Sequence, residues 1–96
     1  MTLSFHIPTA LRVFSGGAER VELNAPAAGT VQDALAALYA QHPGLRDRVQ
    51  DERGIVRAHV QVFVGAESIR YTGGLATPLT GDRAEISILP AVSGGC

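Results

Sequence analysis

The sequence ends in Ser93-Gly94-Gly95-Cys96, four residues that offer two kinds of chemistry. Cys96 is the only cysteine, so it forms no disulfide within the chain and cannot hold a metal ion alone. Its thiol is one candidate for a working group. The other is the backbone at the two glycines, because a residue without a side chain allows close approach to another molecule. The question is therefore whether glycine or cysteine does the work.

The residues just before this group are small and uncharged. Pro90 stops the last strand-like stretch, and Ala91 and Val92 follow it. Such a tail can thread a narrow channel in a partner and present its end to an active site. A frayed terminus is the simpler alternative, because the last residues of most domains are poorly ordered. We expect one domain over residues 1–90 and a flexible tail over residues 91–96.

Elsewhere the chain lacks the side-chain combinations that catalysis or metal binding requires. No histidine is placed beside a loop serine to act as its base. The histidines His6, His42 and His59 show no metal-binding spacing. We therefore expect no catalytic residue, no metal site and no bound cofactor, and hence a protein that is not itself an enzyme.

A candidate partner surface surrounds the glycine pair in the C-terminal half of the chain. Arg70 and Tyr71 precede Gly73, Gly74 and Leu75. The lysine and helix start that a phosphate-binding loop needs are missing, which favours a simple turn. Loops often carry contacts, so these five residues are also a candidate surface for a partner.

The composition excludes several classes of partner. The net charge is -1, and the eight basic residues are all arginines, spread from Arg12 to Arg83. This distribution lacks the basic patch that nucleic acid or an anionic membrane attracts. No apolar run approaches the roughly 20 residues of a spanning helix, and the first ten residues do not resemble a signal peptide. We expect a cytoplasmic protein. Without lysine, the chain cannot be linked to itself through lysine isopeptide bonds.

The first half of the chain predicts a hairpin followed by a helix. Apolar residues alternate from Leu3 to Ile7, resume at Leu11 and Val13 after Pro8, and alternate again up to residue 24, which predicts a hairpin over residues 3–24. Thr30 is a good N-cap, with Asp33 in the capping-box position. An apolar stripe with helical spacing follows and ends before Pro43, and a short helical piece is expected at residues 45–49.

The second half predicts three strands. Alternation predicts a strand over residues 56–64, a short return over residues 69–71 and a final strand over residues 84–89. Strands around one main helix indicate the α+β class. We expect a β-grasp (ubiquitin-like) fold, a mixed sheet of four to five strands with one main helix packed across it. A ferredoxin-like fold, the alternative, would need a second long helix.

The whole chain resembles the ThiS/MoaD family of ubiquitin-like sulfur carriers, and within it the CysO-type carriers of cysteine biosynthesis. The resemblance rests on Ile7 to Arg12 (IPTALR), Arg70 to Leu79 (RYTGGLATPL), Gly81-Asp82 and Ile88 to Gly95 (ILPAVSGG). Two glycines alone are weak evidence. Two glycines after a β-grasp pattern and the stretch Ile-Leu-Pro-Ala-Val are much stronger.

The resemblance implies a carrier cycle that partner enzymes run. An E1-like enzyme uses ATP to adenylate the terminal glycine, and a sulfur donor replaces AMP to give a thiocarboxylate. A PLP-dependent cysteine-synthase-like enzyme then takes the sulfur, and a JAMM-type zinc metalloprotease frees cysteine, so zinc and pyridoxal phosphate belong to partners. Gly95 would carry the sulfur, and Gly94 would allow the tail to pass through a narrow channel of a partner. The residues implied to dock in partner channels are Leu89, Pro90, Ala91, Val92 and Ser93.

Cys96 departs from the family pattern, in which working carriers end in Gly-Gly. Three explanations are open. Cys96 is removed from a precursor by a JAMM-type protease, or it is the cysteine product of the cycle caught before release, or it is an inert added residue. In each case Gly95 as written is locked in a peptide bond.

Two other functions share this tail. One is a ubiquitin-like modifier, in which Gly95 is joined to lysines of target proteins. The other is a small non-covalent subunit of a molybdopterin-synthase-like complex, whose tail inserts into a catalytic partner. For a carrier, the acceptor stays open among cysteine, homocysteine and thioacid natural products, because all would use the same carrier end.

Overall fold

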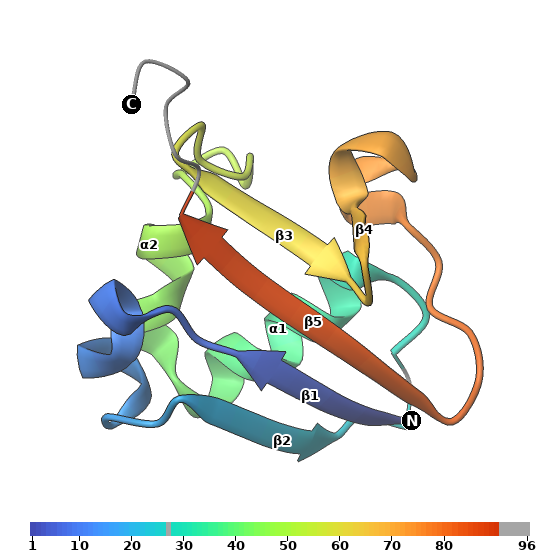
Figure 1. Ribbon diagram of the computed structural model, residues 1–96, viewed down its shortest axis with the longest axis horizontal. Coiled ribbons are helices and arrows are strands. Elements are labelled where there is room, and N and C mark those ends of the chain that lie inside the picture. Colours follow the sequence, from blue (N-terminus) through green and yellow to red (C-terminus); the bar gives the residue numbers. More distant parts are fainter. Residues whose placement is uncertain (27, 91–96) are drawn as a thin grey trace.

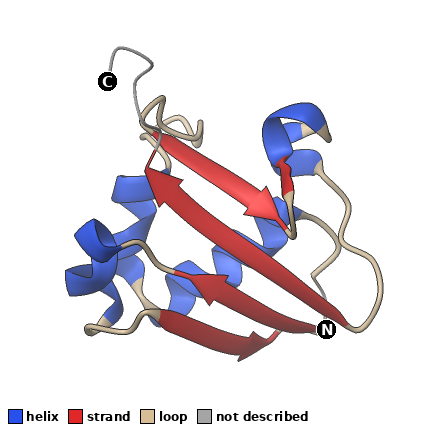
Figure 2. Cartoon of the chain, in the orientation of Figure 1, coloured by secondary structure: helices blue, strands red, loops and turns tan. Residues whose placement is uncertain are grey.

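A computed structural model of the protein describes residues 1–26 and 28–90. A five-stranded mixed sheet with the order β2-β1-β5-β3-β4 forms one layer, and the helices lie across one of its faces (Figures 1 and 2). The central pair, β1 and β5, is parallel, and the other neighbours are antiparallel. This order and the chain sequence of elements confirm the predicted β-grasp fold. The strands are β1 (Thr2–His6), β2 (Arg20–Asn24), β3 (Val60–Val64), β4 (Glu67–Ser68) and β5 (Arg83–Pro90).

The hairpin of β1 and β2 is confirmed, but its connection is not extended as predicted. Residues after Pro8 form the 3-10 helix η1 (Thr9–Ser15), in which the Leu11 N–H donates to the Pro8 carbonyl at 2.9 Å. The alternation had placed Leu11 and Val13 on one face. In the structure Leu11 packs against the core, whereas Val13 is 77% exposed, because a 3-10 turn places residues i and i+3 on the same side.

The main helix, α1 (Val31–Gln41), begins and ends where the sequence predicts. Thr30 accepts a hydrogen bond from the Asp33 N–H, and Asp33 accepts one from the Thr30 N–H, so both halves of the capping box form. A 3-10 turn, η2 (Pro43–Leu45), follows, and then the short helix α2 (Arg46–Val49) at the predicted place.

Asp33→Asn is expected to make the stability of the fold fall less steeply as the pH becomes acidic. The Gly29 N–H, the largest influence, and Thr30 hold the pKa of the Asp33 carboxyl below its ordinary value of 3.8. Because the folded-state pKa is the lower one, the charged carboxyl stabilises the fold above the unfolded-state pKa. That contribution is lost as the pH falls through the folded-state pKa.

Thermal unfolding between about pH 6 and about pH 2 measures this difference. The wild-type melting temperature should drop more steeply than that of the variant. A residual slope is expected in both, because hydrogen bonds from Ile55 and Arg53 also lower the pKa of Asp51. Parallel curves would contradict the assignment to Asp33.

The core lies between the sheet and α1. Phe5 and Leu3 on β1, Ile86 and Ile88 on β5, and the Leu35 side of α1 are fully buried. Each buried aliphatic or aromatic side chain contributes about 1.5–3 kcal/mol of transfer free energy. β1 and β3, which pair with β5 on either side, and this core thus fix the position of the C-terminal end of β5.

Two strand boundaries in the second half were predicted wrongly. The strand expected from residue 56 begins at Val60, because Asp51 accepts hydrogen bonds from the Arg53 and Ile55 N–H groups and closes the preceding loop on itself. The return strand expected at residues 69–71 is the shorter β4, and the 3-10 helix η3 (Ile69–Tyr71) follows it. Ser68 caps η3 by accepting a bond from the Arg70 N–H.

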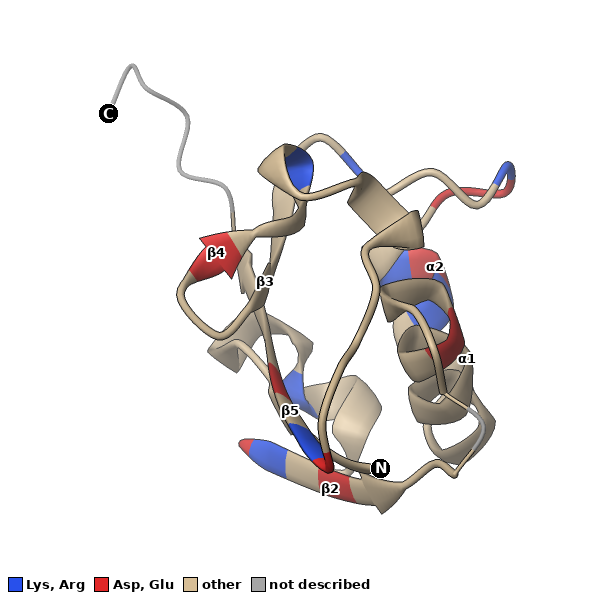
Figure 3. Cartoon of the chain, turned by 90° about the vertical axis from the view of Figure 1, so that its right-hand side faces the viewer, with Lys and Arg blue, Asp and Glu red and all other residues tan. Residues whose placement is uncertain are grey.

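Charged residues are distributed over the whole described surface. In Figure 3 acidic and basic segments interleave along the strands and helices, and each sign is found on both layers. Of the three ion pairs in the described residues, the pair that links two strands joins Arg20 of β2 to Glu85 of β5 at 3.2 Å.

Candidate functional site

The end of β5 brings the start of the predicted tail to one corner of the sheet. Pro90 is paired with Val60, the first residue of β3, and Leu89 with Gln61. Leu89 is 41% exposed, a large fraction for an apolar residue in a paired strand. The remaining predicted tail residues, Ala91 to Cys96, lie outside the described residues.

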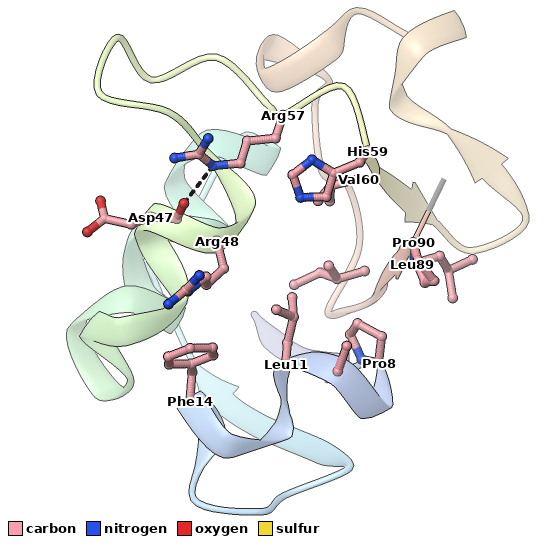
Figure 4. Close-up of a pocket in the computed structure, with 12 residues that line it drawn as sticks. Pro8, Leu11, Phe14, Asp47, Arg48, Arg57, His59, Val60, Leu89 and Pro90 are labelled. Carbon is pink, nitrogen blue, oxygen red and sulfur yellow. Dashed lines mark hydrogen bonds between the residues drawn. The ribbon is translucent and has the colours of Figure 1, made fainter. Parts of the chain in front are cut away.

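A groove of about 390 Å³ adjoins this corner, and we call it the exit groove. Its walls come from η1, from α2, from the segment that leads into β3 and from the end of β5 (Figure 4). It therefore lies beside Pro90, the last residue that the structure describes. The lining residues are Pro8, Ala10, Leu11, Phe14, Asp47, Arg48, Arg57, His59, Val60, Ile88, Leu89 and Pro90.

Phe14 and Arg48 form one wall of the exit groove. The Arg48 guanidinium carbon lies 4.5 Å from the centre of the Phe14 ring, within the range of a cation–π contact (Figure 4). The ring also packs on η2, since a Cβ added at Gly44 would come within 3.1 Å of the Phe14 Cδ1 atom. This position needs a small residue so that Phe14 can lie flat beneath Arg48.

Arg57 also lines the exit groove and is tied to α2. Its Nε donates to the Asp47 carbonyl at 2.6 Å, and its backbone N–H donates to the Val49 carbonyl at 2.9 Å (Figure 4). The exposed His59 follows two residues later. Two arginines, one histidine and one aspartate thus line the exit groove among apolar residues, which suits a partner that offers an apolar side chain next to a carboxylate.

A buried polar network holds the loop between α2 and β3. The Tyr39 hydroxyl donates to the Gln50 Oε1 at 2.6 Å, and the Gln50 Nε2 donates to the Gly54 carbonyl at 2.7 Å. Burial raises the pKa of the Tyr39 hydroxyl well above its ordinary value, so this hydroxyl stays protonated and donates. The network fixes the segment that carries Arg57 and His59.

The candidate partner surface at residues 70–75 is only partly brought together. Arg70, Gly74 and Leu75 line a second groove of about 360 Å³ beside β3, which we call the edge groove. Tyr71, 82% exposed, lines a separate shallow hollow, and Gly73 has a φ of 121°. The edge groove shares Arg57 and Val60 with the exit groove, so the two lie on either side of the segment entering β3.

Phe14, Arg48 and Arg57 belong to the exit groove but were not among the predicted site residues. Leu11 and Phe14 have the i, i+3 spacing of a 3-10 or helical turn, and that spacing was the available signal. Nothing in the sequence pairs Phe14 with Arg48, because their contact depends on how η1 packs against α2.

Two kinds of feature are absent from the residues that the structure describes. They contain no cluster of three or more histidine, cysteine or acidic side chains able to hold a metal ion. Over residues 1–26 and 28–90, no helix reaches the length and hydrophobicity needed to cross a membrane.

Comparison with known proteins identifies relatives that match most or nearly all of the chain. The family model ThiS matches residues 5–95. The sulfur carrier protein CysO of Mycobacterium tuberculosis is 35% identical over 97 residues, covering 99% of this chain and all of CysO. Small archaeal modifier protein 1 of Haloferax volcanii is 37% identical over 79 residues, covering 82% of this chain and 85% of that protein.

Solved structures agree with these relatives. The crystal structure of M. tuberculosis CysO matches with a TM-score of 0.82 and 33% identity, over 94% of this chain and 99% of that one. CysO in the Amycolatopsis orientalis BexX/CysO complex matches with a TM-score of 0.81 and 30% identity, over 97% and 99%. The fold, the matched residues and the extent of identity together show that this chain belongs to the ThiS family.

Proposed function

We propose that this chain is a sulfur carrier whose working group is the carboxylate of Gly95. The observation that carries the proposal is the junction at Pro90, where a firmly held strand ends beside an apolar groove and Ala-Val-Ser-Gly-Gly follows in the sequence. Similarity to CysO over nearly the whole chain supports the same conclusion. Leu89 and Pro90 then dock the carrier, while the segment beyond them reaches the partner's active site.

The proposed chemistry has three steps. Water hydrolyses the peptide bond between Gly95 and Cys96 and leaves a free Gly95 carboxylate. A carboxylate oxygen then attacks the α-phosphorus of ATP, and pyrophosphate leaves. Hydrosulfide, or the terminal sulfur of a persulfide donor, attacks the acyl carbon, and the carbon–oxygen bond to AMP breaks with its electron pair going to AMP. The product is a thiocarboxylate, and a persulfide donor would also need two electrons from a reductant.

Partner enzymes supply every cofactor in this cycle. An E1-like enzyme binds ATP, a JAMM-type protease contributes zinc for the first hydrolysis, and a PLP-dependent enzyme of the cysteine-synthase type receives the sulfur. The complex of a CysO with BexX supports the idea that such carriers act docked on another protein. The carrier itself contributes the Gly95 carboxylate, at the end of a segment whose side chains are small.

Intact-mass analysis tests the carrier function. The chain ending at Gly95 is incubated with an E1-like partner, ATP and a hydrosulfide source. We expect a mass gain equal to the difference between sulfur and oxygen. Iodoacetamide should then alkylate the new thiocarboxylate, with loss of iodide, and add the mass of one carbamidomethyl group. An unchanged mass with an enzyme that is active on its own carrier would refute the proposal.

A protein modifier is the second candidate function, favoured by the similarity to small archaeal modifier protein 1. The same adenylate would then be attacked by a target lysine, forming an isopeptide bond and releasing AMP. Cell extracts separate the two candidates. A ladder of high-mass conjugates that resists reductant favours the modifier. Because the chain has no lysine, such a ladder must reflect target proteins rather than lysine-linked chains of this protein.

A further inference from the structure

Arg48 is the arginine of the exit groove that is fully available to a partner. It is exposed, and no ion pair or side-chain hydrogen bond joins its guanidinium to another residue that the structure describes. Arg57, the other arginine of the groove, already donates through its Nε to the Asp47 carbonyl. All the N–H donors of Arg48 can therefore bind a group that another molecule brings.

Phe14 gives the Arg48 guanidinium a fixed place. The guanidinium carbon lies 4.5 Å from the ring centre, where the negative face of an aromatic ring attracts a cation (Figure 4). The ring is in turn held against Gly44, at which an added Cβ would come within 3.1 Å of it. Gly44 is not among the glycines with a positive φ, so the close approach of Phe14 is what requires a small residue there. Arg48 is thus positioned before a partner arrives, which lowers the entropic cost of binding.

The apolar part of the exit groove is open to a partner. Leu89, at 41%, and Pro90 are exposed, and Leu11 is half-buried, so another molecule can reach their side chains. The buried residues Val60 and Ile88 lie beneath them as the floor of the groove. Covering such a surface with an apolar side chain is favourable, because it removes apolar area from water.

A partner that fills the groove must also cover Arg48, because the same groove of about 390 Å³ is lined by Arg48 and Leu89. An unpaired charge that is removed from water carries a desolvation penalty. A carboxylate against the guanidinium offsets this penalty and can accept two parallel hydrogen bonds. Asp47 does not fill this role, since its carboxylate lies 3.7 Å from Arg46. The partner is therefore expected to bring the carboxylate.

We propose that Arg48 selects the partner that docks in the exit groove, by pairing with a carboxylate of the adenylating enzyme. An apolar side chain of the same enzyme then lies between Leu11 and Leu89. Phe14 is a positioning residue that acts through Arg48. The proposal rests on the proposed carrier function and deepens it by naming the chemistry that the enzyme's contact surface must have.

Charge reversal at two positions of α2 tests the proposal. The chain ending at Gly95 is compared with its Arg48→Glu and Arg46→Glu variants, using pyrophosphate release by an E1-like enzyme at varied carrier concentration. Arg46 is the matched control, because it is exposed on the same helix and does not line the groove. We expect kcat/KM to fall about tenfold or more for Arg48→Glu, through KM, and less than about threefold for Arg46→Glu.

Reversal of charges on the enzyme identifies the carboxylate. Surface aspartates and glutamates of the E1-like enzyme are replaced one at a time by arginine. One replacement should impair adenylation of the parent chain and raise kcat/KM for Arg48→Glu by about tenfold, because it restores an opposite pair. Added salt should also lower kcat/KM of the parent chain more steeply than that of Arg48→Gln. If no replacement rescues Arg48→Glu, carboxylate pairing is wrong.

Substitution of Phe14 tests its positioning role. Phe14→Tyr keeps the ring face and should keep the KM of the parent chain, whereas Phe14→Leu should raise KM with kcat unchanged. Combining Phe14→Leu with Arg48→Gln should add no loss beyond that of Arg48→Gln alone, because both remove the same contact. Additive losses would show that Phe14 does not act through Arg48. Thermal unfolding of each variant verifies that it is folded at the assay temperature.

The possible outcomes separate this docking role from the carrier function. If intact mass shows that the parent chain gains sulfur while Arg48→Glu and Arg46→Glu have equal kinetics, the role of Arg48 is overturned and the carrier function stands. If the parent chain gains no sulfur with an enzyme active on its own carrier, the carrier function is refuted, and the docking role with it. A higher kcat/KM for Arg48→Gln would assign Arg48 to the chain's own terminal carboxylate and overturn the proposal.

Discussion

A chain that keeps Cys96 is expected to gain no sulfur when incubated with an E1-like enzyme, ATP and hydrosulfide, whereas a chain ending at Gly95 is expected to be converted. The reason is chemical. Adenylation needs a free carboxylate on the residue that will carry sulfur, and Gly95 followed by Cys96 offers only an amide carbonyl. An amide carbonyl is a far weaker nucleophile than a carboxylate, so the effect is close to all-or-none. Intact mass before and after incubation measures it.

Cys96→Ser is the matched control, because it removes the thiol and keeps the peptide bond. If glycine is the working residue, this variant stays as inactive as the parent chain. A JAMM-type protease that removes residue 96 should restore conversion of both. The opposite pattern, an active chain with Cys96 and an inactive one with Ser at that position, would make the thiol the working group and refute the assignment to Gly95.

The elements that the sequence predicts correctly are those whose apolar residues recur at a regular spacing. The stripe from Val31 to Leu38 and the capping box at Thr30 and Asp33 depend on neighbours three or four residues away, and both appear as expected. β5 also follows its alternation, because it buries Ala84, Ile86 and Ile88 on one face, whereas in β1 Ser4 is buried as well as Leu3 and Phe5. These features are set locally and then reinforced by the core.

The failures occur where a proline or hydrogen bonds from side chains override the regular spacing of apolar residues. Alternation at Leu11 and Val13 predicted a strand, but Pro8 supplies no N–H to a ladder and the chain turns into η1 instead. Alternation at residues 56–59 is likewise overridden, because Gln50 and Asp51 bind the backbone of the loop they precede. These hydrogen bonds of the Gln50 and Asp51 side chains form only in the folded loop and leave no pattern in the sequence.

The residues of the candidate site also fall into two groups, those that could be predicted from the sequence and those that could not. Leu89 and Pro90 could be named from sequence, since they end the last strand. The exit groove beside them could not, because Phe14, Arg48 and Arg57 come from three separate segments. Their meeting depends on a cation–π contact and on a hydrogen bond to the Asp47 carbonyl, neither of which leaves a pattern in the sequence.

Leu89→Asp is expected to lower the kcat/KM for adenylation of the chain ending at Gly95 by about 30-fold or more, with kcat little changed. An apolar side chain buried at the centre of an interface is worth about 2 kcal/mol or more, and an aspartate there adds an unpaired charge. The loss falls on KM because the docking contact is made equally in the ground state and the transition state. Pyrophosphate release at varied carrier concentration measures both constants.

Val13→Asp is the control that isolates docking from stability. Val13 is also an exposed apolar residue, at 77%, yet it does not line the exit groove. Both substitutions should change the free energy of unfolding by less than about 1 kcal/mol, since each removes a side chain that already faces solvent. Only Leu89→Asp should impair adenylation. Equal kinetics for the two variants would show that the partner does not bind beside β5, and the exit groove would lose its proposed role even if Gly95 carries sulfur.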